Sequence, residues 1–299
     1  MKSDRIRGLL CGLTAALIWG GFPVITRFGA LRSGLDVYDI TFIRFTVAAL
    51  VTAPALFRSD RPSWKLTAVL TFGLGAPYLL VVGNALTRAP VALFAQLTPT
   101  TMIMFSAGLG TVFLRERLTS RQGAGVAAIT VGSSLAAVEF LTNNHGITSA
   151  VGQFVAGGFL WAIYTVAVKR SHISAFTATS CVSAASFLIY CPLYLYFKGL
   201  ETVSHPSLAL AEQALYQGVL MSVVALYFYS RAVSLLGASI GASFAALAPV
   251  ISTIEAVLLL SERPSALSIV GLAVSVLGIA AVLAPNRALK ESVCATLET

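Results

Sequence analysis

Ten apolar stretches, each long enough to cross a membrane as a helix, constrain the fold of this chain more than any other feature. A helix needs roughly 20 mostly apolar residues to cross about 30 Å of hydrocarbon. The stretches lie near residues 8–28, 40–57, 65–87, 91–114, 120–140, 150–169, 175–197, 210–230, 237–260 and 266–284. They lack the strict alternation of a barrel strand. We therefore predict an all-α integral membrane fold with ten transmembrane helices.

The composition and the short connections indicate the same class. Of the 299 residues, 57% are hydrophobic and 11% are charged, whereas soluble domains are near half apolar and a quarter charged. No connection is long enough for a separate soluble domain, so we predict a single transmembrane domain over 1–299, with 285–299 as a cytoplasmic tail. The first apolar run passes signal-peptide length and lacks a small-residue cleavage site, so we interpret it as a retained helix.

The basic residues predict which side of the membrane each end faces. Lys and Arg accumulate in short cytoplasmic connections. Most of the 20 basic residues fall at the start of the chain, at its end and on connections that follow even-numbered stretches. We therefore expect both termini in the cytoplasm of a multi-pass protein of the cell inner membrane. This topology explains the net charge of +8, so no nucleic-acid partner is expected.

The two halves of the chain resemble each other. Glu116-Arg117 recurs as Glu262-Arg263. Other pairs at the same or a similar offset are Gly125 and Gly271, Gly132 and Gly278, Trp19 and Trp161, and Arg27 and Lys169. Each half, 8–140 and 150–284, holds five stretches, so the second would enter the membrane from the opposite side. Such inverted repeats are typical of secondary transporters, with a substrate site near the midplane between the repeats.

These features resemble a known family. The chain has "LIWGGFPVITR" in its first stretch, Arg44 early in its second, and a Glu-Arg pair after the fourth and ninth stretches. This pattern resembles the drug/metabolite transporter superfamily and, within it, the EamA family, especially YddG-type aromatic amino-acid exporters. The resemblance implies a basket-shaped bundle of ten helices that exports amino acids, drugs or other metabolites from the cytoplasm.

Four prolines are expected to act as hinges and to mark the walls of a cavity. A proline inside a membrane helix frees backbone groups that neighbouring polar groups must satisfy. The four residues are Pro23, Pro77, Pro99 and Pro249, and all four are predicted to lie well inside their helices. Ordinary curvature or close packing through small residues is the alternative interpretation.

Aromatic and uncharged polar residues within the stretches are the candidates for binding a substrate. Aromatic rings offer apolar area, and Tyr and Trp add one hydrogen bond each. The predicted substrate-binding residues are Trp19, Tyr78, Asn84, Gln96, Thr98, Trp161, Tyr164, Tyr227 and Ser243. For the aromatic residues an interfacial belt or plain packing is the alternative, and for the polar ones it is hydrogen bonding between helices.

Glu255, within the ninth stretch, is the candidate for coupling transport to protons. A charged side chain at the membrane centre costs about 2.5–3.5 kcal/mol on insertion scales, so it should face a cavity or a partner, or be protonated. It could instead bind a substrate amine, reach outer-side water, or pair with Arg44 or Arg88. Arg44 is expected to have a structural role, paired with Asp36, Asp39 or a helix end.

Several function classes have no support in the sequence. There is no G-x-x-x-x-G-K-[ST] motif for ATP, and no zinc-protease or nucleophile-elbow motif, so we expect no enzyme activity. Cys11, Cys181, Cys191 and Cys294 lack metal spacing, and no cofactor or metal is expected. We predict a secondary transporter of amino acids, aromatic or otherwise neutral, working by alternating access.

Other possibilities stay open from the sequence alone. The substrate could be another metabolite or drug class. A nucleotide-sugar or sugar-phosphate exchanger is disfavoured because phosphate is usually held by Lys or Arg, and no lysine lies deep in the stretches. A membrane scaffold would not need hinge prolines. The expected partners are a small-molecule substrate and the lipid bilayer, with the chain as a monomer or weak homodimer.

Overall fold

The structure, a computed structural model, describes residues 2–57, 62–116, 118–143, 148–205, 207–236, 244 and 247–283. All regular elements in these ranges are helical, and the described residues contain no strand. Eight of the predicted spans are helices long and apolar enough to cross a membrane, and two shorter apolar helices follow them. The chain is therefore an all-helical membrane protein.

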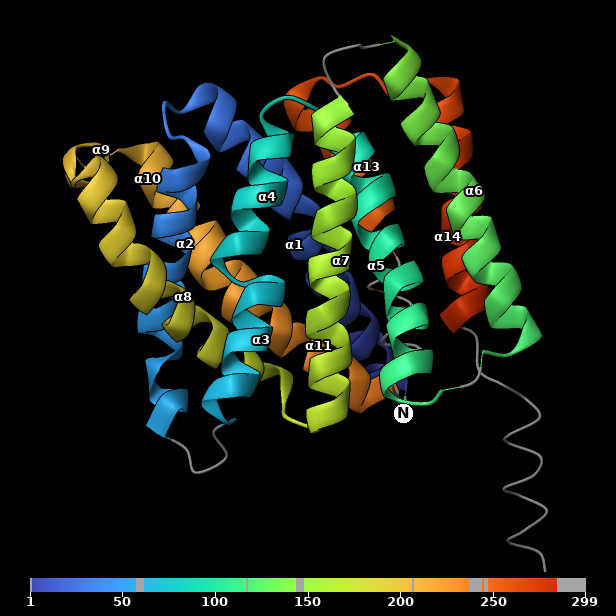
Figure 1. The fold of residues 1–299 in the computed structure, drawn as a ribbon, viewed down its shortest axis with the longest axis horizontal. Helices are drawn as coiled ribbons and strands as arrows, with labels where there is room; N and C mark the ends of the chain where they lie inside the picture. Colours follow the sequence, from blue (N-terminus) through green and yellow to red (C-terminus); the bar gives the residue numbers. More distant parts are fainter. Residues whose placement is uncertain are drawn as a thin grey trace, which may run out of the picture.

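The elements follow one another as an up-and-down bundle (Figure 1). In order they are α1 (Lys2–Arg32), α2 (Val37–Thr52), η1 (Ala53–Phe57), α3 (Trp64–Leu74), α4 (Ala76–Leu86), α5 (Val91–Phe113), α6 (Ser120–Asn143), α7 (Thr148–Ser171), α8 (Ala175–Lys198), α9 (Glu201–Ser204), α10 (Leu208–Gln213), η2 (Ala214–Val224), α11 (Ala225–Leu236), α13 (Ala248–Leu260) and α14 (Ala266–Leu283). Helix α1 begins and α14 ends at the lower end of the bundle in Figure 1. We call the opposite end the upper end.

Three of the predicted spans contain more than one helical element: the second span continues from α2 into η1, and the third and eighth spans are interrupted within their length. The third is divided at Gly75, which ends α3 and precedes α4 with an extended backbone. The break frees the N–H of Ala76, and the Ser186 hydroxyl of α8 accepts it at 3.1 Å. The eighth joins α10, the π-helical η2 and α11 into one apolar span. Such breaks are tolerated in a membrane only where other protein groups satisfy the backbone.

The core lies where α1, α4, α5 and α7 meet. Its aromatic rings are in contact: the centroid of Phe94 of α5 lies 5.9 Å from that of Phe22 of α1, with the rings tilted, and 5.6 Å from that of Phe154 of α7, edge to face. Large apolar side chains such as Leu188 and Ile189 are exposed on the outside of the bundle. Lipid is as apolar as such side chains, so this outward distribution fits a membrane protein.

Helices α6 and α14 form one side of the bundle (Figure 1) and meet through glycine. A methyl group on Gly125 would lie 2.7 Å from the Gly278 carbonyl oxygen, and one on Gly278 would lie 2.7 Å from that of Gly125. Gly132 and Gly271 approach each other in the same reciprocal way. Small residues let membrane helices approach closely, so these glycines set the distance between the two helices.

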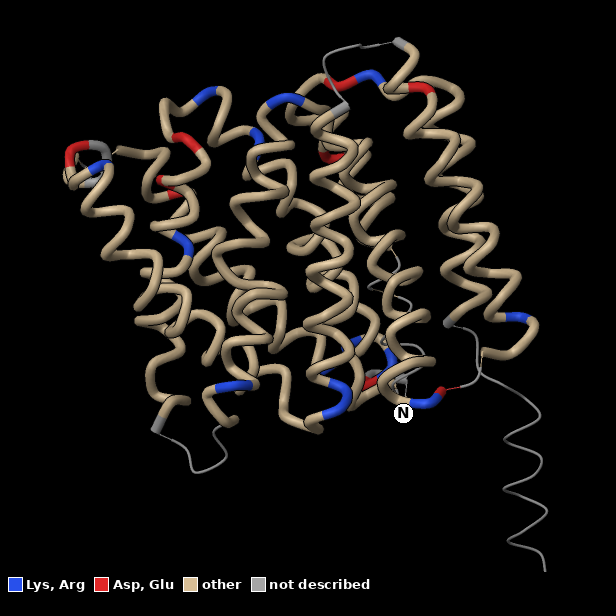
Figure 2. The backbone as a smooth tube through the Cα atoms, in the orientation of Figure 1, with Lys and Arg blue, Asp and Glu red and all other residues tan. Residues whose placement is uncertain are grey.

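The charged residues gather at the two ends of the bundle and leave most of its middle free (Figure 2). This distribution is what a hydrocarbon layer requires, because charged side chains are costly at its centre. The few charged side chains away from the ends therefore need partners.

Candidate functional site

Arg44 is the centre of a polar group in the middle of the bundle. It projects from α2, and its Nη1 donates to Oε1 of Gln217 in η2 at 2.9 Å. Gln217 Nε2 donates in turn to Oγ1 of Thr26 in α1, also at 2.9 Å. Gln217 and Thr26 are fully buried, whereas Arg44 is half-buried. The group thus joins three helices around the guanidinium.

Aromatic rings surround this arginine. Its guanidinium carbon lies 5.3 Å from the centroid of Phe22 and 5.7 Å from that of Phe45. An arginine over a ring face is stabilised by the ring quadrupole. Among the described residues no Asp or Glu pairs with Arg44. A positive charge with free donors beside aromatic rings can hold the carboxylate of a small molecule.

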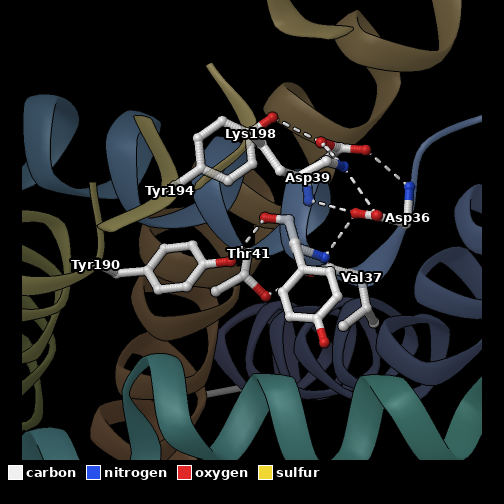
Figure 3. A network of polar contacts seen from close by, with 8 residues as sticks. Asp36, Val37, Asp39, Thr41, Tyr190, Tyr194 and Lys198 are labelled. Atoms are coloured by element: carbon white, nitrogen blue, oxygen red, sulfur yellow. Dashed lines mark hydrogen bonds and ion pairs between the residues drawn. The ribbon is translucent and has the colours of Figure 1, made fainter. Parts of the chain in front are cut away.

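The expected pairing of Arg44 with Asp36 or Asp39 is wrong, because Lys198 of α8 takes both carboxylates (Figure 3). Its Nζ lies 2.8 Å from Asp36 Oδ2 and 2.7 Å from Asp39 Oδ1. The Tyr194 hydroxyl donates to Asp39 Oδ1 at 2.6 Å. The two aspartates also form the capping box that begins α2. The cluster therefore fixes the start of α2, the helix that carries Arg44, against the end of α8.

The same cluster changes the acidity of Asp36, which precedes the span. Partial burial alone would raise the pKa of Asp36. This effect is outweighed by the hydrogen bond from Lys198, the hydrogen bond from the backbone N–H of Asp39 and the attraction of the ammonium. The pKa of Asp36 therefore lies below the ordinary value of an aspartate. Hydrogen bonds and a nearby cation both favour the ionised form, so Asp36 contributes to stability as a carboxylate.

Glu255 of α13 lies near α1 and η2. It is half-buried, its Oε2 is buried, and the described residues offer that atom no hydrogen-bond partner. A methyl group on Gly21 would lie 3.0 Å from this oxygen and would also meet the Tyr216 hydroxyl. That hydroxyl donates to the Ile18 carbonyl at 2.6 Å. Gly21 thus leaves room for an unpartnered carboxyl oxygen, which is suited to take a proton or a cationic group.

The alternative partners of Glu255 are engaged elsewhere. Arg44 donates to Gln217. Arg88 is exposed and donates to Asn84 and Gln153, at 2.5 Å each. No ion pair joins Glu255 to either arginine in the part of the chain that the structure describes. Asn84, a predicted binding residue, is thus occupied by Arg88.

Two of the predicted aromatic residues come together between α4 and α7, and a third lies nearby against α3. Tyr78 and Trp161 meet edge to face, with centroids 6.1 Å apart and planes at 71°. Tyr164 lies one turn from Trp161 and packs on Gly73 of α3. Trp19 instead packs on Tyr229 of α11, at 5.0 Å.

The structure separates Tyr227 from these residues. Its side chain is 64% exposed, and its ring packs on the neighbouring Phe228. Ser243 lies outside the described residues.

The polar residues of α5 are packed between helices. Thr98 is fully buried and donates to the Phe154 carbonyl of α7 at 3.1 Å. Gln96 is also buried, and its Nε2 donates to the Ala92 carbonyl at 3.2 Å. Its Oε1 finds no partner among the described residues. Thr98 therefore joins α5 to α7, and Gln96 keeps a free acceptor.

The prolines differ from the expectation that all four lie well inside their helices. Pro23 and Pro99 do so, in α1 and α5. Pro77 and Pro249 stand instead in the first turn of α4 and of α13. A proline there loses no intrahelical hydrogen bond, because the first-turn N–H groups have no partner in the helix. These two prolines begin helices, and the freed backbone lies just before them.

Besides those of Lys198, two further ion pairs lie near the ends of the bundle. Arg27 of α1 pairs with Glu262, which follows α13, at 3.2 Å. The Glu262 carboxylate also accepts the N–H groups of Val91, at 3.0 Å, and Ala92, at 3.4 Å, at the start of α5. Lys169 of α7 pairs with Glu116, which follows α5, at 2.7 Å. Sequence reasoning noted all four residues as repeated positions but did not predict that they pair.

A hollow of about 230 Å³ lies elsewhere, at the C-terminal end of α2. It is lined by Val51, Thr52, Pro54, Ala55 and Phe176. None of the candidate residues lines it, and its lining offers only one side-chain hydroxyl. It is therefore not a candidate for the polar recognition of a substrate.

Comparison with known proteins shows that the chain is similar to transporters. The model of the EamA-like transporter family matches residues 6–138 and again residues 148–284. An uncharacterized inner membrane transporter of Escherichia coli K12, YhbE, is 28% identical over 188 residues, 56% of this chain and 56% of that protein. The chain thus spans about half the length of that relative.

Two further relatives have names that mention amino acids. A probable amino-acid metabolite efflux pump of Salmonella typhimurium is 26% identical over 53% of this chain and 52% of its own. A probable terminal-alkyne amino-acid exporter of Streptantibioticus cattleyicolor is 27% identical over 88% of this chain and 89% of its own.

A solved structure described as "Crystal structure of protein" has a TM-score of 0.60, with 22% identity over 92% of this chain and 97% of that chain. That likeness shows the fold alone.

Proposed function

The chain belongs to the EamA-like transporter family, and on this premise we propose that it exports neutral amino acids, aromatic ones among them, from the cytoplasm by alternating access. The observation that carries the proposal is the half-buried Arg44, which has no acidic partner among the described residues and lies beside aromatic rings. A guanidinium is suited to a substrate carboxylate. Relatives whose names mention amino-acid export support this substrate class.

The proposed substrate site extends from Arg44 toward the aromatic residues of α4 and α7. Tyr78 and Trp161 are in mutual contact and could stack on the side chain of an aromatic or other neutral substrate. Tyr78 belongs to the same buried cluster as Phe22 and Phe45, the two rings beside Arg44. The remaining proposed contacts are Trp19, Asn84, Gln96, Thr98, Tyr164 and Ser243. Of these, Gln96 keeps a buried free acceptor, which a substrate donor could use.

We propose that the protein contains two inverted five-helix repeats. The two separate matches to one family model support this arrangement. So do the glycine contacts of α6 and α14. Gly125 corresponds in sequence to Gly271, and Gly132 to Gly278. Gly125 contacts Gly278, the counterpart of Gly132, and Gly132 contacts Gly271, the counterpart of Gly125. A two-fold axis between the helices would produce such crossed pairs.

The proposed orientation places both termini in the cytoplasm of the inner membrane. The positive-inside distribution supports it, and α1 begins at the same end of the bundle at which α14 ends (Figure 1). The lower end then faces the cytoplasm and the upper end the outside. Glu255 is the proposed coupling residue, because its buried oxygen has no hydrogen-bond partner among the described residues.

A transport assay tests the proposal. The purified full chain is reconstituted into liposomes, and movement of radiolabelled Phe, Trp, Thr and Met is measured with and without a pH gradient. We expect saturable transport that Arg44→Gln reduces tenfold or more, about 1.4 kcal/mol of binding. Arg121→Gln removes an exposed arginine in the first turn of α6 as the matched control and should leave transport unchanged.

Absence of transport of all four amino acids by folded, monodisperse protein would reject this substrate class in favour of another metabolite. Equal transport by Arg44→Gln and the wild type would reject the assignment of the carboxylate to Arg44.

A further inference from the structure

The two ion pairs near the ends of the bundle are related to each other. Arg27 and Lys169 occupy corresponding positions in the two halves of the sequence, and so do Glu116 and Glu262. Each basic residue pairs with the glutamate of the other half. Arg27 and Glu262 lie where α1 and α13 end, and Lys169 and Glu116 lie where α7 and α5 end. One arrangement is therefore used twice, at opposite ends of the bundle.

The upper pair is largely buried and belongs to a larger group of contacts. The side chains of Arg27 and Glu262 are 17% and 11% exposed. The guanidinium also donates to the carbonyls of Leu86 and Ala89 at the end of α4. The carboxylate accepts two N–H groups at the start of α5, where Pro90 supplies no side-chain cap. This group holds the ends of α1, α4, α5 and α13 together.

The lower pair is a surface contact. The side chains of Lys169 and Glu116 are 60% and 44% exposed. A lysine ammonium is a point charge, whereas the arginine fork can hold a carboxylate and several carbonyls at once. Exposed ion pairs contribute little to stability, and buried ones are costly to separate. The two ends therefore differ in how firmly the halves are joined.

We propose that the two ion pairs are the two gates of one transport cycle, and that this structure has the upper gate closed and the lower gate only loosely held. This inference rests on the proposed transport function. Opening the upper end requires Arg27 and Glu262 to separate as α1 and α13 part. The lower end then closes by burying Lys169 and Glu116. Corresponding residues make both contacts, so the free energy lost when one ion pair breaks is balanced by the gain when the other becomes buried. The state with the upper end closed and the state with the lower end closed then have similar free energies.

Distances between spin labels test this reciprocity. In a background with all four cysteines replaced by alanine, labels at Leu31→Cys and Leu259→Cys measure the separation of α1 and α13 at the upper end. In a second protein, labels at Phe113→Cys and Arg170→Cys measure the separation of α5 and α7 at the lower end. All four positions are exposed. The distributions are recorded in nanodiscs by double electron–electron resonance, without substrate.

The two glutamate variants should shift the distances in opposite senses. Glu262→Gln removes the charge of the upper gate but keeps an amide oxygen that can accept the α5 N–H groups. We expect it to lower the ratio of short to long upper distances by about tenfold or more and to shorten the lower distances. Glu116→Gln is the matched variant of the corresponding position, and it should lengthen the lower distances and leave the upper pair short.

The proposal is overturned if folded Glu262→Gln and Glu116→Gln protein leave both distributions unchanged, or move both ends in the same direction. Glu116 is exposed, so its variant should fold. If Glu262→Gln does not fold, an unchanged lower distance in Glu116→Gln overturns the proposal by itself.

The measurement separates this inference from the proposed function. Reciprocal shifts without amino-acid transport would keep the gates and reject the substrate class. Transport without any shift would reject the gates alone.

Discussion

The glycine contact between α6 and α14 gives a prediction whose magnitude can be worked out from the structure. Replacing Gly278 by alanine would place a methyl carbon 2.7 Å from the Gly125 carbonyl oxygen, 2.8 Å from Cγ1 of Ile129 and 2.9 Å from its backbone nitrogen. Two of these three atoms belong to the backbone of α6 and cannot move aside as a side chain can. The two helices must therefore separate by several tenths of an ångström.

The net cost is the difference between two opposing effects. Inserting a methyl group into a closely packed contact destabilises a protein by about 1–3 kcal/mol. Alanine in place of glycine within a helix stabilises it by about 0.5–1 kcal/mol. We therefore expect Gly278→Ala to lower the free energy of unfolding by about 1–2 kcal/mol. For a large chain this corresponds to a fall in Tm of roughly 2–4 °C for each kcal/mol.

A matched control lies on α6 itself. A methyl group on Gly123 would meet no atom within 4 Å, so Gly123→Ala should leave the apparent Tm unchanged or raise it. Gly271→Ala, whose methyl group would lie 2.7 Å from the Gly132 carbonyl oxygen, should behave like Gly278→Ala. Thermal unfolding is followed by tryptophan fluorescence in detergent. Equal Tm values for Gly278→Ala and Gly123→Ala would refute the argument that backbone contact sets the distance between α6 and α14.

Three further variants test polar groups. Glu255→Gln should abolish the response of transport to a pH gradient, because Oε2 is buried without a hydrogen-bond partner among the described residues. Glu212→Gln, at an exposed position, is the control. An unchanged response in Glu255→Gln would exclude Glu255 as the coupling residue. The stabilisation from the depressed pKa of Asp36 is present above about pH 4 and lost as the pH falls through that pKa, so the Tm of Asp36→Asn should fall less in acid than that of the wild type. Ser186→Ala leaves the Ala76 N–H without its acceptor and should lower the free energy of unfolding by about 1–3 kcal/mol, followed by thermal unfolding. Ser204→Ala, at an exposed position, should lower it little. Equal losses of stability in the two variants would argue against this role of Ser186.

The sequence predicts the fold class well because hydrocarbon imposes one strong rule. Every span must be apolar and helical, and the eight candidate membrane spans of the described residues coincide with predicted stretches. The recurring glycines were also visible as a pattern, and they lie at the α6–α14 contact. Of the predicted ninth stretch, 237–260, the structure describes residue 244 and residues 247–260.

The partners of polar side chains could not be predicted in the same way. Hydropathy gives the length of a span but not the direction in which each face turns or which helix lies beside it. Arg44 was expected to pair with aspartates a few residues away, yet its acceptor is Gln217. Those aspartates pair instead with Lys198, which follows them by 162 and 159 positions, so no local sequence pattern points to it.

The repeated Glu-Arg motif predicts an important position but not its role. Its recurrence indicates that Glu262 is important, but it does not indicate which groups the side chain contacts. In the structure α5 begins after Pro90, which cannot cap it with a side chain, and the carboxylate of Glu262 takes that role from the other half of the chain. A negative charge at a helix N-terminus is favourable, and the ion pair with Arg27 holds the carboxylate in place. Capping, pairing and joining the two halves thus depend on one side chain, which explains why an acidic residue at that position could serve both stability and movement.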